Sequence, residues 1–119
     1  MTNIDPIDLV KRYHAALNQF DSAVITPMFA EDATYTSPSV GVLRGRDQII
    51  AAMQSYFSEF PDQVAEDEKI ELVAPLAVRC EWRLMATSAT SGAPSIRRGV
   101  ETLVLLPDGR IRSIDVEDR

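Results

Sequence analysis

The strongest constraint on how this chain folds is a change in the spacing of its hydrophobic residues at Pro61. Before Pro61 the apolar residues recur every three or four positions, as in amphipathic helices, and after it they alternate, as in β-strands. Helices followed by hairpin-connected strands are typical of an α+β domain, in which helices cover one face of an antiparallel sheet. We therefore expect a single domain over residues 1–119, a length that leaves no room for a second core.

The helical part of the sequence contains two long segments and one short one. Asp5 suits the N-cap and Pro6 the first turn of the first helix. The apolar face of that helix consists of Leu9, Tyr13, Ala16, Leu17 and Phe20. A short helix is expected over 21–29, with Ala23, Val24 and Met28 turned inward. The third helix begins at Arg46 and ends before Pro61, and its apolar positions are Ile49, Ala52, Met53, Tyr56, Phe57 and Phe60.

The alternating segments predict five strands, over 33–37, 64–74, 77–88, 96–106 and 110–117. Residues 39–45 contain two glycines and are expected to form a loop. Pro107-Asp108-Gly109 predicts the hairpin between the last two strands. The inner face of strand 77–88 should carry Val78, Cys80, Trp82 and Leu84, and that of strand 96–106 should carry Gly99, Glu101, Leu103 and Leu105.

The composition argues against several classes of function. A net charge of −6 does not favour nucleic-acid binding, which depends on Lys and Arg at phosphates. One cysteine and one histidine allow neither an internal disulfide nor a zinc set. No apolar run approaches the roughly 20 residues of a membrane span. The first residues lack the features of a signal peptide, so we expect a cytoplasmic protein without nucleic-acid or membrane partners.

The chain also resembles a known family in several motifs with characteristic spacing. These are Lys11-Arg12-Tyr13, Met28-Phe29-Ala30-Glu31-Asp32-Ala33-Thr34, Pro38, Gly45-Arg46-Asp47-Gln48-Ile49 and Asp108-Gly109-Arg110-Ile111. Together they resemble the SnoaL-like and ketosteroid-isomerase-like branch of the nuclear-transport-factor-2-like superfamily. The resemblance implies a cone-shaped α+β barrel, in which three helices pack on a curved, mostly antiparallel sheet and enclose a pocket. It also implies a homodimer through the outer sheet face, with Arg79, Glu81, Arg83, Thr102 and Val104 at the contact.

The resemblance further implies positions for catalytic groups. Tyr13 stands where the isomerases carry a catalytic tyrosine, and Glu101, eight residues before Gly109, stands where they carry a carboxylic acid. The general-base carboxylate is replaced by Ser37, which cannot shuttle a carbon-bound proton near neutral pH. Faithful ketosteroid isomerisation is therefore not expected, although Glu101 could serve as the base instead.

Each candidate residue also has a purely structural interpretation. Tyr13 could be a core aromatic whose hydroxyl meets a backbone group, and Glu101 could form a salt bridge with Arg97 or Arg83. His14 is expected to face solvent, because it lies about 100° around the helix from Tyr13. The run Glu66-Asp67-Glu68 is expected to be solvated.

The sequence thus leaves three functions open. The first is an isomerase, cyclase or dehydratase that acts on a small hydrophobic, steroid- or polyketide-like molecule, with Tyr13 and Glu101 as catalytic residues and no metal or organic cofactor. The second is a non-catalytic carrier or sensor with the same pocket, and the third is a dimeric interaction module. The expected ligand-binding residues are Tyr35, Ser37, Phe57, Trp82 and Leu103.

Overall fold

The computed structural model describes residues 5–118, which form three α-helices, a 3₁₀ turn and one sheet. The elements are α1 (Pro6–Gln19), α2 (Ser22–Ile25), a 3₁₀ turn η1 (Thr26–Met28), β1 (Phe29–Ser37), β2 (Gly41–Arg44), α3 (Arg46–Glu59), β3 (Val64–Ala74), β4 (Ala77–Thr87), β5 (Pro94–Leu105) and β6 (Ile111–Asp118).

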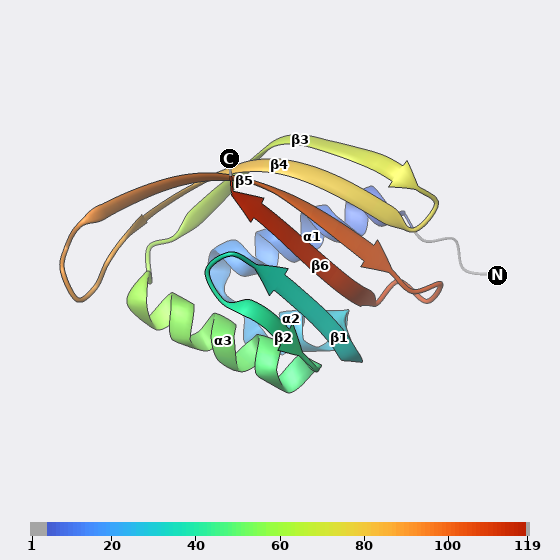
Figure 1. Cartoon of the computed structure of the whole chain (residues 1–119), viewed down its shortest axis with the longest axis horizontal. Coiled ribbons are helices and arrows are strands. Elements are labelled where there is room, and N and C mark those ends of the chain that lie inside the picture. Colours follow the sequence, from blue (N-terminus) through green and yellow to red (C-terminus); the bar gives the residue numbers. More distant parts are fainter. Residues whose placement is uncertain (1–4, 119) are drawn as a thin grey trace.

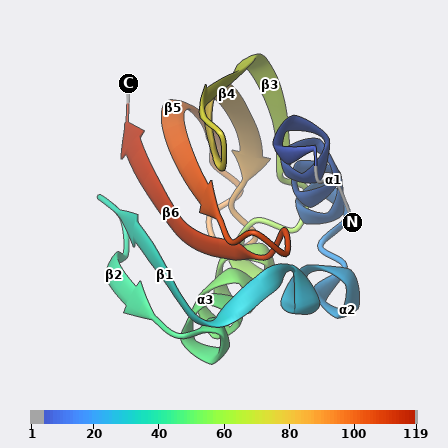
Figure 2. The same cartoon turned by 90° about the vertical axis from the view of Figure 1, so that its right-hand side faces the viewer.

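The six strands form one sheet in the order β2-β1-β6-β5-β4-β3. Strands β1 and β6 pair in parallel, and every other neighbouring pair is antiparallel. The sheet arches over α1, and α3 lies below β1 and β2 (Figure 1). A view from the side shows the sheet bending around the helices (Figure 2). The α+β fold with helices on a curved, mostly antiparallel sheet is therefore confirmed.

The helix ends follow from local chemistry. The Asp5 carboxylate accepts a hydrogen bond from the Asp8 backbone N–H at 3.2 Å and caps α1. Asp21 caps α2 in the same way through Val24. Helix α3 runs over the predicted residues, and its N-cap Gly45 has a φ of +91°, which favours glycine. The Gly45 N–H donates to the Ala33 carbonyl at 2.7 Å, which ties the start of α3 to β1.

Two local predictions were wrong. The α2 segment is a single turn that buries Ile25 and leaves Ala23 and Val24 exposed, because so short a helix offers too few positions to define an apolar face. Residues 41–44 form the edge strand β2, which pairs antiparallel with β1, and not a loop. Val42 on this strand is exposed, so β2 shows no alternation of buried residues that could mark it in the sequence.

Strand β3 contains a β-bulge that decides which of its side chains face inward. Asp67 pairs with Trp82 and Lys69 with the next residue of β4, Glu81, so Glu68 is an extra residue in the ladder. Asp67 and Ile70 are three positions apart and would face opposite sides of a regular strand. With the bulge between them, both face inward: Ile70 lies opposite Cys80 and packs against the core.

The core lies between the inner face of the sheet, α1 and α3. Its fully buried members include Val10, Tyr13, Phe29, Ile49, Val78 and Leu103. Among the described residues, no helix is long and apolar enough to cross a membrane.

Candidate functional site

A cavity of about 150 Å³ lies between α1, α3 and the inner face of the sheet. Most of its wall is apolar, with side chains such as Leu17, Leu43, Ile49 and Met53. The polar or aromatic side chains that line it include Tyr13, His14, Tyr35, Ser37, Tyr56, Phe57, Asp67, Trp82, Arg97 and Glu101. An apolar cavity with a few convergent polar groups is the usual form of a small-molecule site.

The structure places six of the seven predicted site residues on this cavity, namely Tyr13, Tyr35, Ser37, Phe57, Trp82 and Glu101. The exception is Leu103, which is fully buried and does not line the cavity. Leu103 shares the inner face of β5 with Glu101, as expected from the alternation. It belongs, however, to the hydrophobic cluster that contains Val10 and Val78, and this cluster fills the space beyond Glu101.

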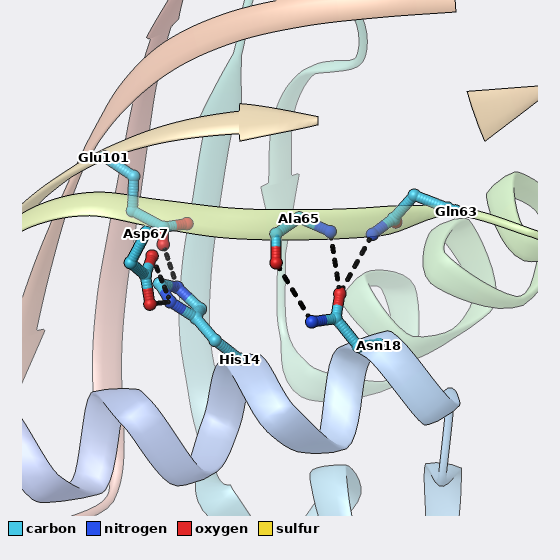
Figure 3. A network of polar contacts seen from close by, with 6 residues as sticks. All are labelled: His14, Asn18, Gln63, Ala65, Asp67 and Glu101. Atoms are coloured by element: carbon cyan, nitrogen blue, oxygen red, sulfur yellow. Dashed lines mark hydrogen bonds and ion pairs between the residues drawn. The ribbon is translucent and has the colours of Figure 1, made fainter. Parts of the chain in front are cut away.

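The imidazole of His14 lies between two carboxylates. Its Nδ1 is 2.9 Å from Asp67, and its Nε2 forms a hydrogen bond with Glu101 Oε1 (Figure 3). The expectation that His14 faces solvent was wrong, because its relative exposure is only 9%. Strands β3 and β4 both contact α1. The curved sheet therefore buries a larger part of the helix surface than the apolar face of α1 alone.

The two carboxylates set the charge of His14. Burial by itself would lower the pKa of the imidazole. The hydrogen bonds and negative charges of Asp67 and Glu101 outweigh burial and raise the pKa of His14 from 6.5 to about 10. His14 is therefore an imidazolium at neutral pH, and both of its N–H groups donate to carboxylate oxygens. Asp67, His14 and Glu101 together carry one negative charge.

Asp67 reaches His14 because α1 holds β3 in place. Asn18 lies one helical turn after His14, and its side chain forms hydrogen bonds with both backbone groups of Ala65, at 2.9 Å to the N–H and 3.0 Å to the carbonyl (Figure 3). Gln63 also donates to Asn18, at 3.5 Å. Sequence reasoning missed Asp67 and Asn18. The available signal was the four-residue spacing of His14 and Asn18, which places two polar side chains on one face of α1.

Glu101 is buried, and only one of its oxygens is bound. Oε1 accepts from His14, and no described residue forms a hydrogen bond with Oε2. The alternative of a salt bridge to Arg97 or Arg83 is not observed, since Arg97 pairs with Asp118 at 2.8 Å and Arg83 Nη2 donates to Met85 Sδ. Glu101 therefore presents a free acceptor to a cavity whose wall is mostly apolar.

Two tyrosine hydroxyls accompany this carboxylate. Burial raises the pKa of both Tyr13 and Tyr35, and the charge of Glu101 raises each further. Both phenols therefore stay protonated and can donate hydrogen bonds. The alternative that the Tyr13 hydroxyl reaches a backbone partner finds no support among the described residues, while its ring packs edge-on against Phe29 at 5.6 Å.

Ser37 and Cys80 have structural explanations. The Ser37 hydroxyl lies 3.1 Å from that of Ser39 and accepts from the Val40 N–H, so it stabilises the turn into β2. Cys80 is fully buried, and burial raises the pKa of its thiol. Potential ligand atoms of His14, Asp67 and Cys80 lie within 4.8 Å of one another. Because the imidazole and the thiol both hold their protons at neutral pH, this set favours protons over a metal ion.

Comparisons with known proteins agree with this fold. The model of the SnoaL-like domain family matches residues 10–114. No curated protein matches the chain. Among solved structures, SalBIII, described as an epoxide hydrolase/cyclase-like enzyme with a role in pyran ring formation in the polyether salinomycin, is 22% identical with a TM-score of 0.84. This match covers 94% of the present chain and 88% of SalBIII.

Two further solved structures are similar. AclR from Streptomyces galilaeus, a putative hydroxylase, is 20% identical with a TM-score of 0.79, and 94% of this chain and 86% of AclR are covered. A hypothetical protein from Catenulispora acidiphila with a ketosteroid isomerase-like fold, solved with trimethylamine, is 18% identical with a TM-score of 0.82. That match covers 94% of this chain and 85% of the other. At these identities the three structures establish the shared fold and leave the chemistry open.

Proposed function

Since the chain belongs to the family of SnoaL-like domains, we propose that it binds a small, largely apolar molecule in the cavity and catalyses an acid–base reaction on it. One observation carries this proposal. The buried carboxylate of Glu101 uses one oxygen to bind the His14 imidazolium and leaves the other unpartnered at the wall of an apolar cavity. Because this oxygen accepts no hydrogen bond from residues 5–118 and lies at the cavity wall, it can accept one from a substrate that supplies a donor.

The roles of the residues follow from their charges. Glu101 Oε2 takes a proton from a hydroxyl or an acidic C–H group of the substrate. Tyr13 or Tyr35 donates a hydrogen bond to the substrate oxygen on which negative charge develops, and the apolar walls strengthen that interaction. The His14 imidazolium, held by Asp67, orients the Glu101 carboxylate. Such a site suits isomerisation, dehydration or cyclisation through an epoxide, and the resemblance to SalBIII supports the last of these.

A second candidate is a non-catalytic carrier or sensor. It is favoured by Ser37, which occupies the position where related isomerases carry their general base. The hydroxyl of Ser37 is already engaged with Ser39 and Val40, and within residues 5–118 no base forms a hydrogen bond with it. A carrier would use the same cavity and the same hydrogen-bond donors without turnover.

One experiment distinguishes the two candidate functions. Aryl-substituted γ-hydroxy epoxides are incubated with the protein, and ring closure is followed by chiral chromatography. In parallel, exchange of α-protons of small aryl ketones in D₂O is followed by NMR. An enzyme should accelerate at least one of these reactions, and Glu101→Gln should reduce the rate by about 100-fold or more. Glu117→Gln is the matched control, since Glu117 is an exposed glutamate on β6. Binding without turnover in the wild type would favour the carrier.

A further inference from the structure

Three inward-facing positions of β5 follow one another along the cavity wall. Arg97, Gly99 and Glu101 are spaced two residues apart and therefore face the same side of the sheet. The Cα atoms of Arg97 and Glu101 are about 13 Å apart at the usual rise of a strand. The Glu101 side chain is 7% exposed and that of Arg97 is 32% exposed. The carboxylate thus lies at the closed end of the cavity and the guanidinium at its open end.

Between these two charges lies the indole of Trp82. Trp82 is the direct pairing partner of Gly99 on β4. A Cβ atom on Gly99 would lie 2.5 Å from Trp82 Cζ2 and 2.6 Å from Cη2, so the ring occupies the space that a side chain would fill. Gly99 is not among the residues with positive φ, and the close approach of the ring therefore explains the glycine. The result is a flat apolar surface between a carboxylate and a guanidinium.

The guanidinium of Arg97 is only partly used by the protein. Its Nη2 donates to Asp118 Oδ1 at 2.8 Å, and within residues 5–118 no hydrogen-bond acceptor faces its other two nitrogens. Burial raises the pKa of the Tyr35 and Tyr56 hydroxyls, and the positive charge of Arg97 partly opposes this at both. Arg97 therefore lies close to the cavity and retains free donors there.

We infer that the cavity selects an elongated organic acid whose flat apolar body stacks on Trp82. A hydroxyl or other proton-bearing group of this molecule reaches Glu101, and its carboxylate binds Arg97 at the open end. This inference rests on the proposed function, because it names the substrate class for the same cavity. A planar carboxylate matches the parallel donors of a guanidinium. Repulsion by the Glu101 carboxylate excludes the acid group from the closed end, so the two charges also set the direction in which the molecule enters.

The experiment compares two probes of nearly the same shape, the anion 6-hydroxy-2-naphthoate and its neutral amide, by isothermal titration calorimetry. The wild type should bind the acid about tenfold more tightly than the amide, as expected for a charge-assisted hydrogen bond. Arg97→Gln should reduce this ratio to about one by removing the charge at the open end. Asp118→Asn should increase it, because the competing carboxylate is removed from Arg97. Arg98→Gln is the matched control: its side chain is 59% exposed, pairs with Glu68 and should leave the ratio unchanged.

The outcomes distinguish this inference from the proposed function. If the amide binds as tightly as the acid, or if Arg97→Gln retains the preference of the wild type, the inference is overturned. The proposed function survives that result as long as the amide still binds. If neither probe binds to the wild type, both are overturned. The acid-to-amide affinity ratio of the Asp118→Asn variant is a separate test that does not depend on the stability of Arg97→Gln.

Discussion

His14 Nδ1 lies 2.9 Å from the Asp67 carboxylate, although the two residues are 53 positions apart. The contact depends on the bulge at Glu68, which turns Asp67 inward, and on Asn18, which fastens β3 to α1. A helix, a bulged strand and the buried Glu101 of β5 thereby build one charged group at the wall of the cavity. The first two predictions concern this group.

The titration of His14 should be displaced far from that of a free imidazole. His14 is the only histidine, so its ring proton signals in an NMR spectrum need no assignment. They should remain those of the imidazolium from pH 5 to 8 and change only near pH 10. Since the folded-state pKa is raised above 6.5, the stabilisation is complete below pH 6.5 and is lost as the pH rises through about 10. The unfolding free energy of the wild type should therefore fall across this range relative to that of His14→Gln. A ring that titrates near pH 6.5 would contradict the buried ion pairs.

Asp67→Asn should lower the pKa of His14, because it removes one of the two negative charges beside the ring and keeps the shape of the side chain. The same NMR titration measures the change. Glu66→Gln is the control, since Glu66 is the exposed neighbour of Asp67 in the sequence and lies opposite Arg83 in the ladder. Equal pKa values of His14 in the two variants would mean that Asp67 does not hold the imidazolium in solution.

Asn18→Ala should destabilise the fold by about 1–3 kcal/mol, because it leaves the N–H and carbonyl of Ala65 without their side-chain partner. Urea unfolding measures the loss. Gln19→Ala provides the comparison, as Gln19 is exposed and next in sequence, and it should change stability by less than about 0.5 kcal/mol. Similar losses for the two variants would show that Asn18 contributes only helix propensity.

Gly99→Ala should displace the indole of Trp82. The added methyl group would lie 2.5 Å from Cζ2 and 3.0 Å from the Glu117 carbonyl oxygen, and relieving this overlap should cost about 1–3 kcal/mol. The fluorescence of Trp82, the only tryptophan, should change with the ring position. Adding Trp82→Phe should recover part of the stability, because phenylalanine lacks the two ring atoms that meet the methyl group. If the stability loss of the double variant equals the sum of the losses of the two single variants, the overlap is not the cause.

We expect a homodimer through the outer face of the sheet. In the single chain this face carries Arg79, Glu81 and Arg83, which are only partly exposed. A second chain would cover the parts of these side chains that remain exposed. Light scattering at micromolar concentration should give twice the chain mass of 13.2 kDa, about 26 kDa. A mass near 13 kDa would rule out the dimer under those conditions.

Much of the fold could be predicted from the sequence because the signals are local. The cap at Asp5, the period of residues 46–59 and the alternation in β4 each act within a few positions of the chain. The same alternation brought Trp82 and Glu101 to the cavity wall. Strand β2 escaped prediction, and the length and buried residue of α2 were predicted wrongly, since these short elements depend on pairing and packing with distant residues more than on their own patterns.

The charged group at the site was decided by the tertiary structure. The periodicity of the sequence placed Tyr13 and Glu101 on the inner side of regular elements, and the family resemblance made them catalytic candidates. It could not place Asp67 there, since a bulge changes the direction of a side chain without changing the pattern of residues around it. Nor could it place His14, because how much of a helix is buried depends on how far the sheet curves around it, and that curvature is set by all six strands together.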